Sequence, residues 1–238
     1  MLPHNKIIKT TAKKFFEPEN IFQVGNSRSW LDDNGYYAII VEFQSGSYTK
    51  SASLNTGVTF LWESTKVLSE TLAYNYGCDV NASFVKYEND DETFRIGVER
   101  LAKIALEKVN EYRRFSDMDY AKSCLQKEID KLPENRQFWE WYHLAMLCFL
   151  KGDYEEGKGA FERYLERLKD NFYAGDCYIE WREEFYNYCV ENIRCHLTSR
   201  ESAQQMVIDM INRRRNTLCT KRSYEKMRKE PWGLHDVK

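Results

Sequence analysis

Apolar and polar residues alternate in two stretches near the start of the chain. In residues 36–44 every odd position is apolar, and these positions are Tyr37, Ile39, Val41 and Phe43. In residues 54–62 one side of the alternation is mostly apolar, and its members are Leu54, Thr56, Val58, Phe60 and Trp62. A period of two places alternate side chains on opposite faces of a strand. Both stretches are therefore predicted to be β-strands.

Turn-forming residues separate these strands from their neighbours. A short run at residues 28–32 ends at Asp33-Asn34-Gly35, where Asn and Gly tolerate the positive φ angles of a tight turn. Residues 45–47 form a polar link to the next strand, and residues 83–87 are a further possible strand. We predict a small antiparallel sheet of three or four strands.

Apolar residues recur every three or four positions in the rest of the chain, the spacing typical of helices. Helix-capping residues mark several boundaries, with acidic residues from Asp90 onward and Ser116/Asp117 before the next segment. Residues 65–76 leave the choice between loop and helix open. The predicted helices cover residues 4–16, 90–115, 117–132, 176–196 and 199–218, together with a helical hairpin at 138–171.

The hairpin has a defined turn. Gly152 is predicted to end its first helix and Asp153 to cap the second, with Tyr154 and Phe161 packing against Trp141 and Leu144. This spacing resembles one tetratricopeptide-type repeat. A solenoid requires about three stacked copies, and the sequence contains one, which favours a single hairpin within a helical bundle.

These elements predict an α+β protein. Helices are expected to pack on the sheet, and a C-terminal α-helical bundle is expected to follow it. We place an α+β region at residues 1–115 and a helical region at 116–238. No linker rich in Pro, Gly or Ser separates them, so we expect the two regions to share a core.

Composition narrows the functional classes. A formal net charge of −2 creates no overall field towards nucleic acid or membranes. The seven cysteines include no CxxC pair, as expected for reduced thiols in a cytosolic protein. The N-terminus lacks the apolar core of a signal peptide, and the longest apolar run, Leu144 to Leu150, is too short to span a bilayer. We expect a cytoplasmic protein that does not associate with membranes.

The N-terminal half resembles an uncharacterised bacterial family, the domain of unknown function numbered DUF 4304. The resemblance covers residues 1–115. The residues that carry it are Arg28, Ser29 and Trp30, Tyr37, VEFQ at 41–44, LNTGVTFLW at 54–62 and the helix from Phe94 to Arg113. This resemblance implies no activity, ligand or catalytic residue.

Metal and cofactor chemistry find little support in the sequence. Cys177, Cys189, Cys195 and His196 cluster in the sequence, yet Cys189 and His196 are seven positions apart, which is about 10 Å along a helix. A zinc ion requires ligands at about 2.0–2.3 Å, so buried thiols are the favoured interpretation. The chain contains no GxSxG, GxGxxG or GxxxxGK[ST] motif. We expect no metal, no cofactor and no catalytic residue.

One enzymatic alternative remains open. Asp32 or Asp33 before a turn, and Glu42 on the next strand, resemble the carboxylate core of restriction-type nucleases, in which Mg²⁺ activates water. Gln44 stands where such a core has Lys, and the turn is tight. The alternatives are a metal-dependent hydrolase or nuclease and an ordinary polar strand end.

The C-terminal tail is basic. Its cations are Arg213, Arg214, Arg215, Lys221, Arg222, Lys226, Arg228 and Lys229. Such a run can contact nucleic-acid phosphates, but it is also typical of a solvated helix end, where cations complement the helix dipole. We favour the solvated helix end and do not expect nucleic acid as a partner.

An aromatic and polar group on the predicted strands is the remaining candidate binding site. Its members are Arg28, Trp30, Asp32, Asn55 and Trp62. On one sheet surface they would suit a ligand or a protein partner. The alternative is that both tryptophans are core and that Arg28 pairs with Asp32. The sequence favours a non-enzymatic protein-interaction module whose partner is another protein.

Overall fold

The computed structural model describes residues 3–44, 49–63, 68, 72–73, 83–134, 137–174 and 177–236. The polar link predicted at 45–47, and most of the open segment 65–76, lie outside these residues. The chain divides into two compact units, which are described separately. Unit 1 comprises residues 1–114 and 214–231, and unit 2 comprises residues 115–213 and 232–238. The first division follows residue 114, next to the division predicted after residue 115, and residues 214–231 return to unit 1.

Unit 1 contains an antiparallel sheet, as predicted for an α+β fold. Its strands within the described residues are β1 (Phe22–Gln23), β2 (Ser29–Asp33), β3 (Tyr37–Gln44), β4 (Ser51–Phe60), β5 (Leu72–Ala73) and β6 (Phe84–Lys86). The order is β1-β2-β3-β4-β5, and β6 also pairs with β4. The three long strands and β6 match the predicted strands. The sheet has more than four strands because β1 and β5 are two residues long, too short for an alternating pattern to reveal them.

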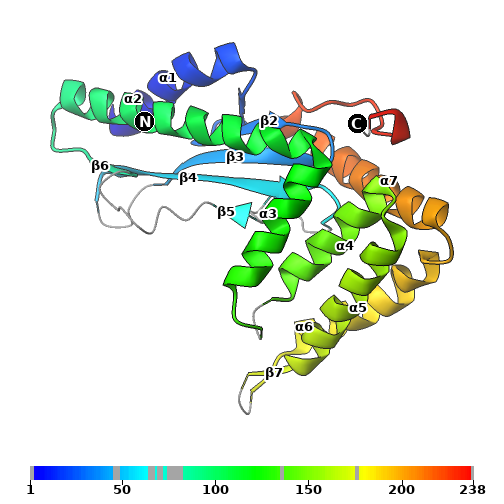
Figure 1. Cartoon of the computed structure of the whole chain (residues 1–238). Coiled ribbons are helices and arrows are strands. Elements are labelled where there is room, and N and C mark those ends of the chain that lie inside the picture. The colour runs from blue at the N-terminus through cyan, green and yellow to red at the C-terminus, as the bar shows by residue number, and fades with distance from the viewer. Residues whose placement is uncertain are drawn as a thin grey trace. The chain divides into compact units, whose positions relative to one another are not determined.

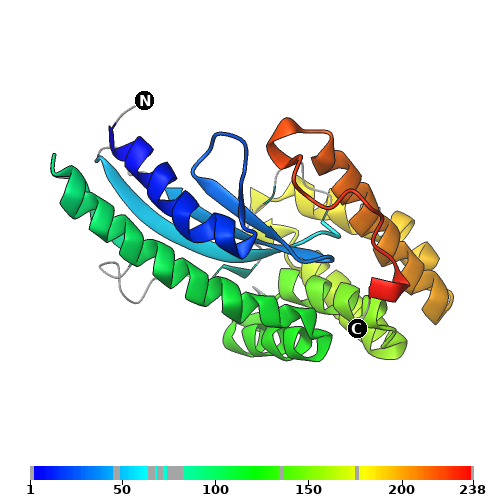
Figure 2. The same cartoon turned by 90° about the horizontal axis from the view of Figure 1, so that it is seen from above.

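Helices α1 (Pro3–Phe16) and α2 (Asp91–Arg113) lie side by side on one face of this sheet (Figures 1 and 2). The side chain of Asp90 accepts hydrogen bonds from the backbone N–H groups of Glu92 and Thr93, so it caps α2 as predicted. The rings of Phe16 and Trp30 meet edge to face at 5.4 Å, and their burial fastens α1 to the sheet.

The strand register defines two faces of the sheet. Cross-strand partners point to the same side, and Ser29 pairs with Glu42, which pairs with Asn55. These three residues therefore form one polar row. The neighbouring row on that side contains Leu31 and Ile40. We call this side the pocket face, and the opposite side, which carries Trp30, the helix-covered face.

The C-terminal part of unit 1 packs against the loop after β1. It comprises the last residues of α7 (Arg200–Cys219), which begins in unit 2, and a 3₁₀ turn at Arg222–Tyr224. Gly25 has a φ angle of +56°, and its N–H donates to the Ser223 carbonyl at 3.2 Å. A Cβ atom on Gly25 would lie 2.9 Å from the Ser223 hydroxyl. Glycine is required here both for the backbone angle and for the close approach.

Within its described residues, unit 2 is helical apart from one short hairpin. Its helices are α3 (Met118–Lys131), α4 (Trp139–Lys151), α5 (Tyr154–Asp170), α6 (Glu180–Asn192) and the first part of α7. Successive helices from α3 to α6 pack on one another. The predicted helix at 176–196 begins late, because β7 (Tyr173–Ala174) and β8 (Cys177–Tyr178) pair as a hairpin before it.

Besides Arg222–Tyr224, the described residues of the two units contain 3₁₀ turns at Glu17–Glu19, Arg114–Ser116, Arg194–His196 and Leu234–Asp236.

The predicted helical hairpin is α4 and α5, with a turn that differs in detail. Gly152 ends α4 with a φ angle of +91°, as expected for a glycine cap. The Asp153 side chain makes no capping hydrogen bond and instead pairs with Lys122 at 3.1 Å, because a cation from α3 competes for its carboxylate. Tyr154 and Phe161 lie against Phe149, whereas Trp141 lies under Arg163.

No helix within the described residues is both long enough and apolar enough to cross a bilayer.

Candidate functional site

The five residues of the predicted binding site do not share a surface. Trp30 and Trp62 are buried, and Trp62 stacks on Phe60 at 4.5 Å. Trp30 and Asp32 lie on the helix-covered face, while Asn55 lies on the pocket face beside Glu42. The Arg28 guanidinium donates to the Asn5 side chain at 3.3 Å. Both tryptophans therefore belong to the core, which was the alternative interpretation.

Asp32 is held by an arginine of α2. The Arg113 Nε donates to the Asp32 carboxylate at 2.8 Å, and its Nη2 donates to the Glu19 carbonyl at 2.7 Å. Burial alone would lower the pKa of Arg113, but the hydrogen bonds that it donates to the carboxylates of Asp32 and Glu19, with the attraction of these charges, outweigh burial and raise the pKa. Asp32 therefore anchors α2 to the sheet.

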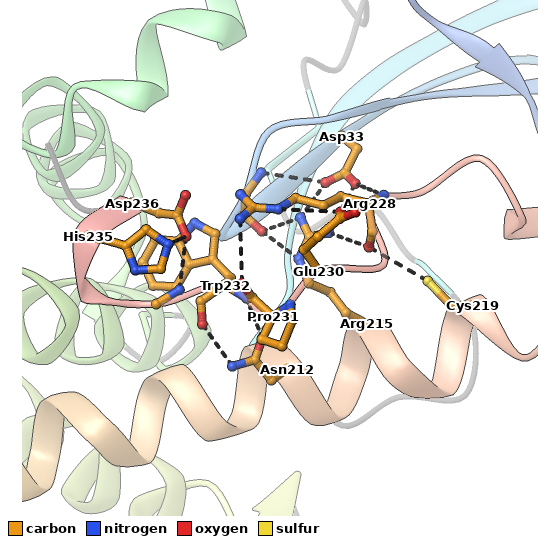
Figure 3. A network of polar contacts seen from close by, with 12 residues as sticks. Asp33, Asn212, Arg215, Cys219, Arg228, Glu230, Pro231, Trp232, His235 and Asp236 are labelled. Atoms are coloured by element: carbon orange, nitrogen blue, oxygen red, sulfur yellow. Dashed lines mark hydrogen bonds and ion pairs between the residues drawn. The ribbon is translucent and has the colours of Figure 1, made fainter.

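Asp33 is held by an arginine from the other end of the chain (Figure 3). Both guanidinium Nη atoms of Arg215 donate to its carboxylate, one of them at 3.0 Å, and the Arg228 backbone N–H donates at 2.9 Å. The Arg215 Nε donates to the Gly35 carbonyl at 3.1 Å. Arg215 is 2% exposed, so this bidentate pair is removed from water and has a structural role.

The three carboxylates of the nuclease alternative do not converge. Asp32 and Glu42 point to opposite faces of the sheet, as the register of β2 and β3 requires. Asp33 shares a face with Glu42 but lies four residues further along the strands, about 13 Å away. Among the described residues no group of three His, Cys, Asp or Glu side chains is placed to hold a metal ion. The geometry does not support a shared Mg²⁺ site.

Glu42 instead lines a cavity of about 400 Å³ on the pocket face. Its walls combine apolar and hydroxyl groups: Val24, Leu31, Ile40 and the ring of Tyr224, with Ser27 and Ser29 beside Glu42. A cavity of this size accommodates a small molecule. The approach of Ser223 to Gly25 fixes the segment that carries Tyr224.

The Glu42 carboxylate has neutral partners. The Ser29 hydroxyl donates to it at 3.3 Å and the Gln44 amide at 2.9 Å. No basic side chain of the described chain forms an ion pair with it, although the carboxylate is half-buried. This distinguishes Glu42 from Asp32 and Asp33, each of which has an arginine.

A second depression of about 350 Å³ adjoins the first at Glu42, Ser27 and Ser29. Two cations, Lys9 and Arg28, also line it. The Lys9 ammonium donates to the carbonyl and, at 2.8 Å, to the side chain of Asn26, so its partners are neutral as well.

Unit 2 has a different feature, an exposed aromatic surface. Of the large hydrophobic side chains that are exposed in the described chain, all except Ile96 come from residues 173–181. Tyr173 is 61% exposed, Tyr178 is 45% exposed and Trp181 is 44% exposed. The Tyr173 and Tyr178 rings lie 5.4 Å apart. We call these three residues the aromatic surface.

The rings of the aromatic surface are supported from below and surrounded by acids. Trp181 lies parallel to Trp139 of α4, with their ring centroids 6.1 Å apart. The Tyr178 hydroxyl donates to the Glu183 carboxylate, and this hydrogen bond raises the pKa of Tyr178 to about 12. The guanidinium of Arg182 lies 5.4 Å from the centre of the Trp181 ring. The aromatic surface thus contacts one cation of its own chain, the guanidinium of Arg182.

Two other sequence predictions are resolved differently in the structure. Arg214 and Arg215 of the basic tail are 5% and 2% exposed, so they are not part of a solvated helix end, because the chain folds back into unit 1. In the cysteine cluster, Cys189 is buried while Cys177 and Cys195 are exposed. Burial raises the pKa of the Cys189 thiol to about 12.

The sequence reasoning missed the aromatic surface because residues from 176 onward were assigned to a helix. The spacing of Tyr173, Tyr178 and Trp181 around Gly175-Asp176 was a usable signal, since Gly-Asp between aromatic residues favours a hairpin turn. The sequence did single out Glu42, but as a metal ligand together with Asp32 or Asp33, and the structure does not bring these carboxylates together.

Comparisons with protein-family models, curated proteins and solved structures found no match. The resemblance of residues 1–115 to DUF 4304 therefore stays a prediction.

Proposed function

We propose that this protein is a non-enzymatic cytoplasmic interaction module, and that the aromatic surface of unit 2 binds a basic segment of a partner protein. The observation that carries the proposal is the concentration of exposed rings at Tyr173, Tyr178 and Trp181. Tyrosine and tryptophan dominate the energetics of protein interfaces because they bury a large, rigid area.

The charges around the aromatic surface favour a cationic partner. Glu180, Glu183 and Glu184 lie in the first turns of α6, next to Trp181. The basic residue among them, Arg182, donates to the Asn171 carbonyl and lies over the Phe138 and Trp181 rings. An arginine or lysine of a partner would find the same combination of ring faces and carboxylates at Tyr173 and Tyr178.

The competing function, a metal-dependent hydrolase or nuclease, has no comparable support. Its three carboxylates lie in different places, and Asp32 and Asp33 are each bound to an arginine.

The test is peptide binding to the full chain, measured by fluorescence anisotropy. The probes are three labelled twelve-residue peptides of the same spacing that carry four Arg, four Lys or four Glu among Gly and Ser. We expect the Arg peptide to bind, the Lys peptide to bind more weakly and the Glu peptide not to bind. Replacing both Tyr173→Ser and Tyr178→Ser should weaken Arg-peptide binding at least tenfold.

The matched control is Ile96→Ser, which removes the other large exposed apolar side chain from α2. This variant should bind the Arg peptide like the unaltered chain. Equal binding of the Arg and Glu peptides, or equal loss in the control and in the double tyrosine variant, would contradict the proposal.

A further inference from the structure

The two adjoining depressions of unit 1 present opposite charges that do not neutralise each other. Glu42 and Lys9 line the same cavity, yet no ion pair joins them, and the described hydrogen-bond partners of both are neutral amides, carbonyls and hydroxyls. Half-buried charges lose hydration and gain from an opposite charge within a few ångströms. The cavity between them is therefore suited to a molecule that carries both charges.

The apolar part of the site lies on the other side of Glu42. Leu31 and Ile40 come from the central strands, while Val24 and the Tyr224 ring form the opposite wall. Side chains on strands and a ring held by the Gly25–Ser223 contact make a largely preformed wall. A hydrocarbon or aromatic group of a ligand would be buried there without a rearrangement of the protein.

We propose that this site of unit 1 binds a small zwitterion with an apolar group, of the α-amino acid class. The ligand ammonium pairs with Glu42 and receives support from the Ser29 hydroxyl. The ligand carboxylate faces Lys9 and Arg28, and its side chain enters the cavity between Ile40 and Tyr224. The combined space of about 400 and 350 Å³ holds such a molecule with room for water. This site is separate from the aromatic surface, and the proposal does not depend on the proposed function.

The first experiment titrates ligands into the full chain and measures binding by ¹⁵N-resolved NMR chemical shifts and by calorimetry. The probes are L-leucine and L-phenylalanine, together with phenethylamine, which lacks the carboxylate, and 3-phenylpropanoate, which lacks the ammonium. We expect at least one of the two amino acids to bind at millimolar concentration or better and to shift the resonances of Ser27, Ser29 and Glu42. Each truncated analogue should bind at least tenfold more weakly.

Variants then assign the two charges. Glu42→Gln keeps the shape of the side chain but removes its charge and one of its two acceptor oxygens, and it should weaken amino acid binding at least tenfold. Val24→Phe fills the apolar wall and should abolish binding of L-phenylalanine. Glu107→Gln, at an exposed position of α2, is the matched control and should bind like the unaltered chain. Unchanged thermal melting of all three variants would show that they are folded.

Several results would overturn the proposal. Absence of binding by both amino acids at 20 mM would show that the site does not bind α-amino acids. Binding of phenethylamine as tight as that of L-phenylalanine would show an organic-cation site in which Lys9 and Arg28 have no part. Unaltered affinity in Glu42→Gln would show that the ligand occupies another place. The double variant Tyr173→Ser with Tyr178→Ser should retain amino acid binding, which separates this test from that of the aromatic surface.

Discussion

Two sets of buried ionisable groups, one in the sheet of unit 1 and one on α4 of unit 2, are accommodated in opposite ways. In unit 1, Asp32 and Asp33 are charged groups in the sheet, and each is matched by an arginine from a distant part of the chain. In unit 2, His143 lies fully buried on α4 beside the Trp139 ring, and burial lowers its pKa to about 3. The sheet of unit 1 therefore pairs these two carboxyl groups with arginines, whereas burial in unit 2 favours the neutral form of His143.

The difference determines which perturbation each unit resists. A buried ion pair does not tolerate the loss of one partner, which leaves an uncompensated charge. A buried neutral histidine tolerates the loss of neighbouring charges but not acid, because the unfolded chain takes up the proton first. The predictions below test this contrast in order of decreasing expected effect.

The largest effect is expected at the Asp33–Arg215 pair. Arg215→Met leaves the Asp33 carboxylate buried without its bidentate partner and should lower the free energy of unfolding by about 3–5 kcal/mol. Urea denaturation at pH 7 measures the change. Lys131→Met, which removes an exposed ion pair with Glu128, is the control and should cost less than about 1 kcal/mol. A loss in Arg215→Met no larger than that of the control would show that the pair is not buried in solution.

Acid should act mainly on unit 2. Because the folded pKa of His143 lies below its ordinary value of 6.5, its contribution to stability is complete above pH 6.5 and decreases as the pH falls towards 3. At pH 5 this amounts to about 2 kcal/mol. Urea denaturation of the unaltered chain and of His143→Phe, at pH 7.5 and pH 5, measures it.

His143→Phe should remove most of this pH dependence, and His196→Gln, at an exposed position, should not change it. Some dependence will remain in the first variant, because burial together with Lys50 and Arg28 also lowers the pKa of His4 in unit 1. Equal pH dependence in all three proteins would contradict a neutral buried His143.

A smaller effect is expected at Asp32. Its partner Arg113 is partly exposed and also binds Glu19, so water and a second acceptor compensate when the charge is removed. Asp32→Asn should cost about 1 kcal/mol in urea denaturation. Hydrogen exchange should show the loss at the C-terminal turn of α2. If Asp32→Asn lowered the free energy of unfolding as much as Arg215→Met, then burial would not be the property that separates the two ion pairs.

The smallest effect is expected from divalent metals. Since Asp32 and Asp33 are bound to arginines and Glu42 lies apart from both, Mg²⁺, Mn²⁺ and Zn²⁺ at 5 mM should leave the melting temperature unchanged relative to EDTA. Glu42→Gln provides a comparison for any change. A metal-dependent rise that this variant abolishes would restore the metal-dependent enzyme as a function.

Local sequence signals predicted the elements that depend on local physics. The alternation in β3 and β4, the turn between β2 and β3 and the caps at Asp90 and Asp117 need only neighbouring residues, and the structure contains all of them, although Asp33 ends β2 instead of opening the turn. The two-residue strands β1 and β5 depend on pairing alone, so no periodic pattern marks them.

The candidate sites required tertiary information. The pairing of Asp33 with Arg215 joins residues 182 positions apart, and no motif connects them. The sequence assigned Trp30 and Trp62 to a possible surface because aromatic alternation does not reveal which face α1 and α2 will cover. Glu42 was recognised as chemically interesting, but its cavity depends on Tyr224 from the far end of the chain.

The return of residues 214–231 to unit 1 has a consequence for biosynthesis. Arg215 follows Asp33 by 182 positions, and at about 5–20 residues per second its synthesis comes about 10–40 s later. During this interval Asp33 has no arginine and the cavity beside Glu42 lacks the Tyr224 wall. The pocket face of the nascent sheet therefore stays incomplete until residues 214–231 have been synthesised, and these residues complete a unit whose sheet was made much earlier.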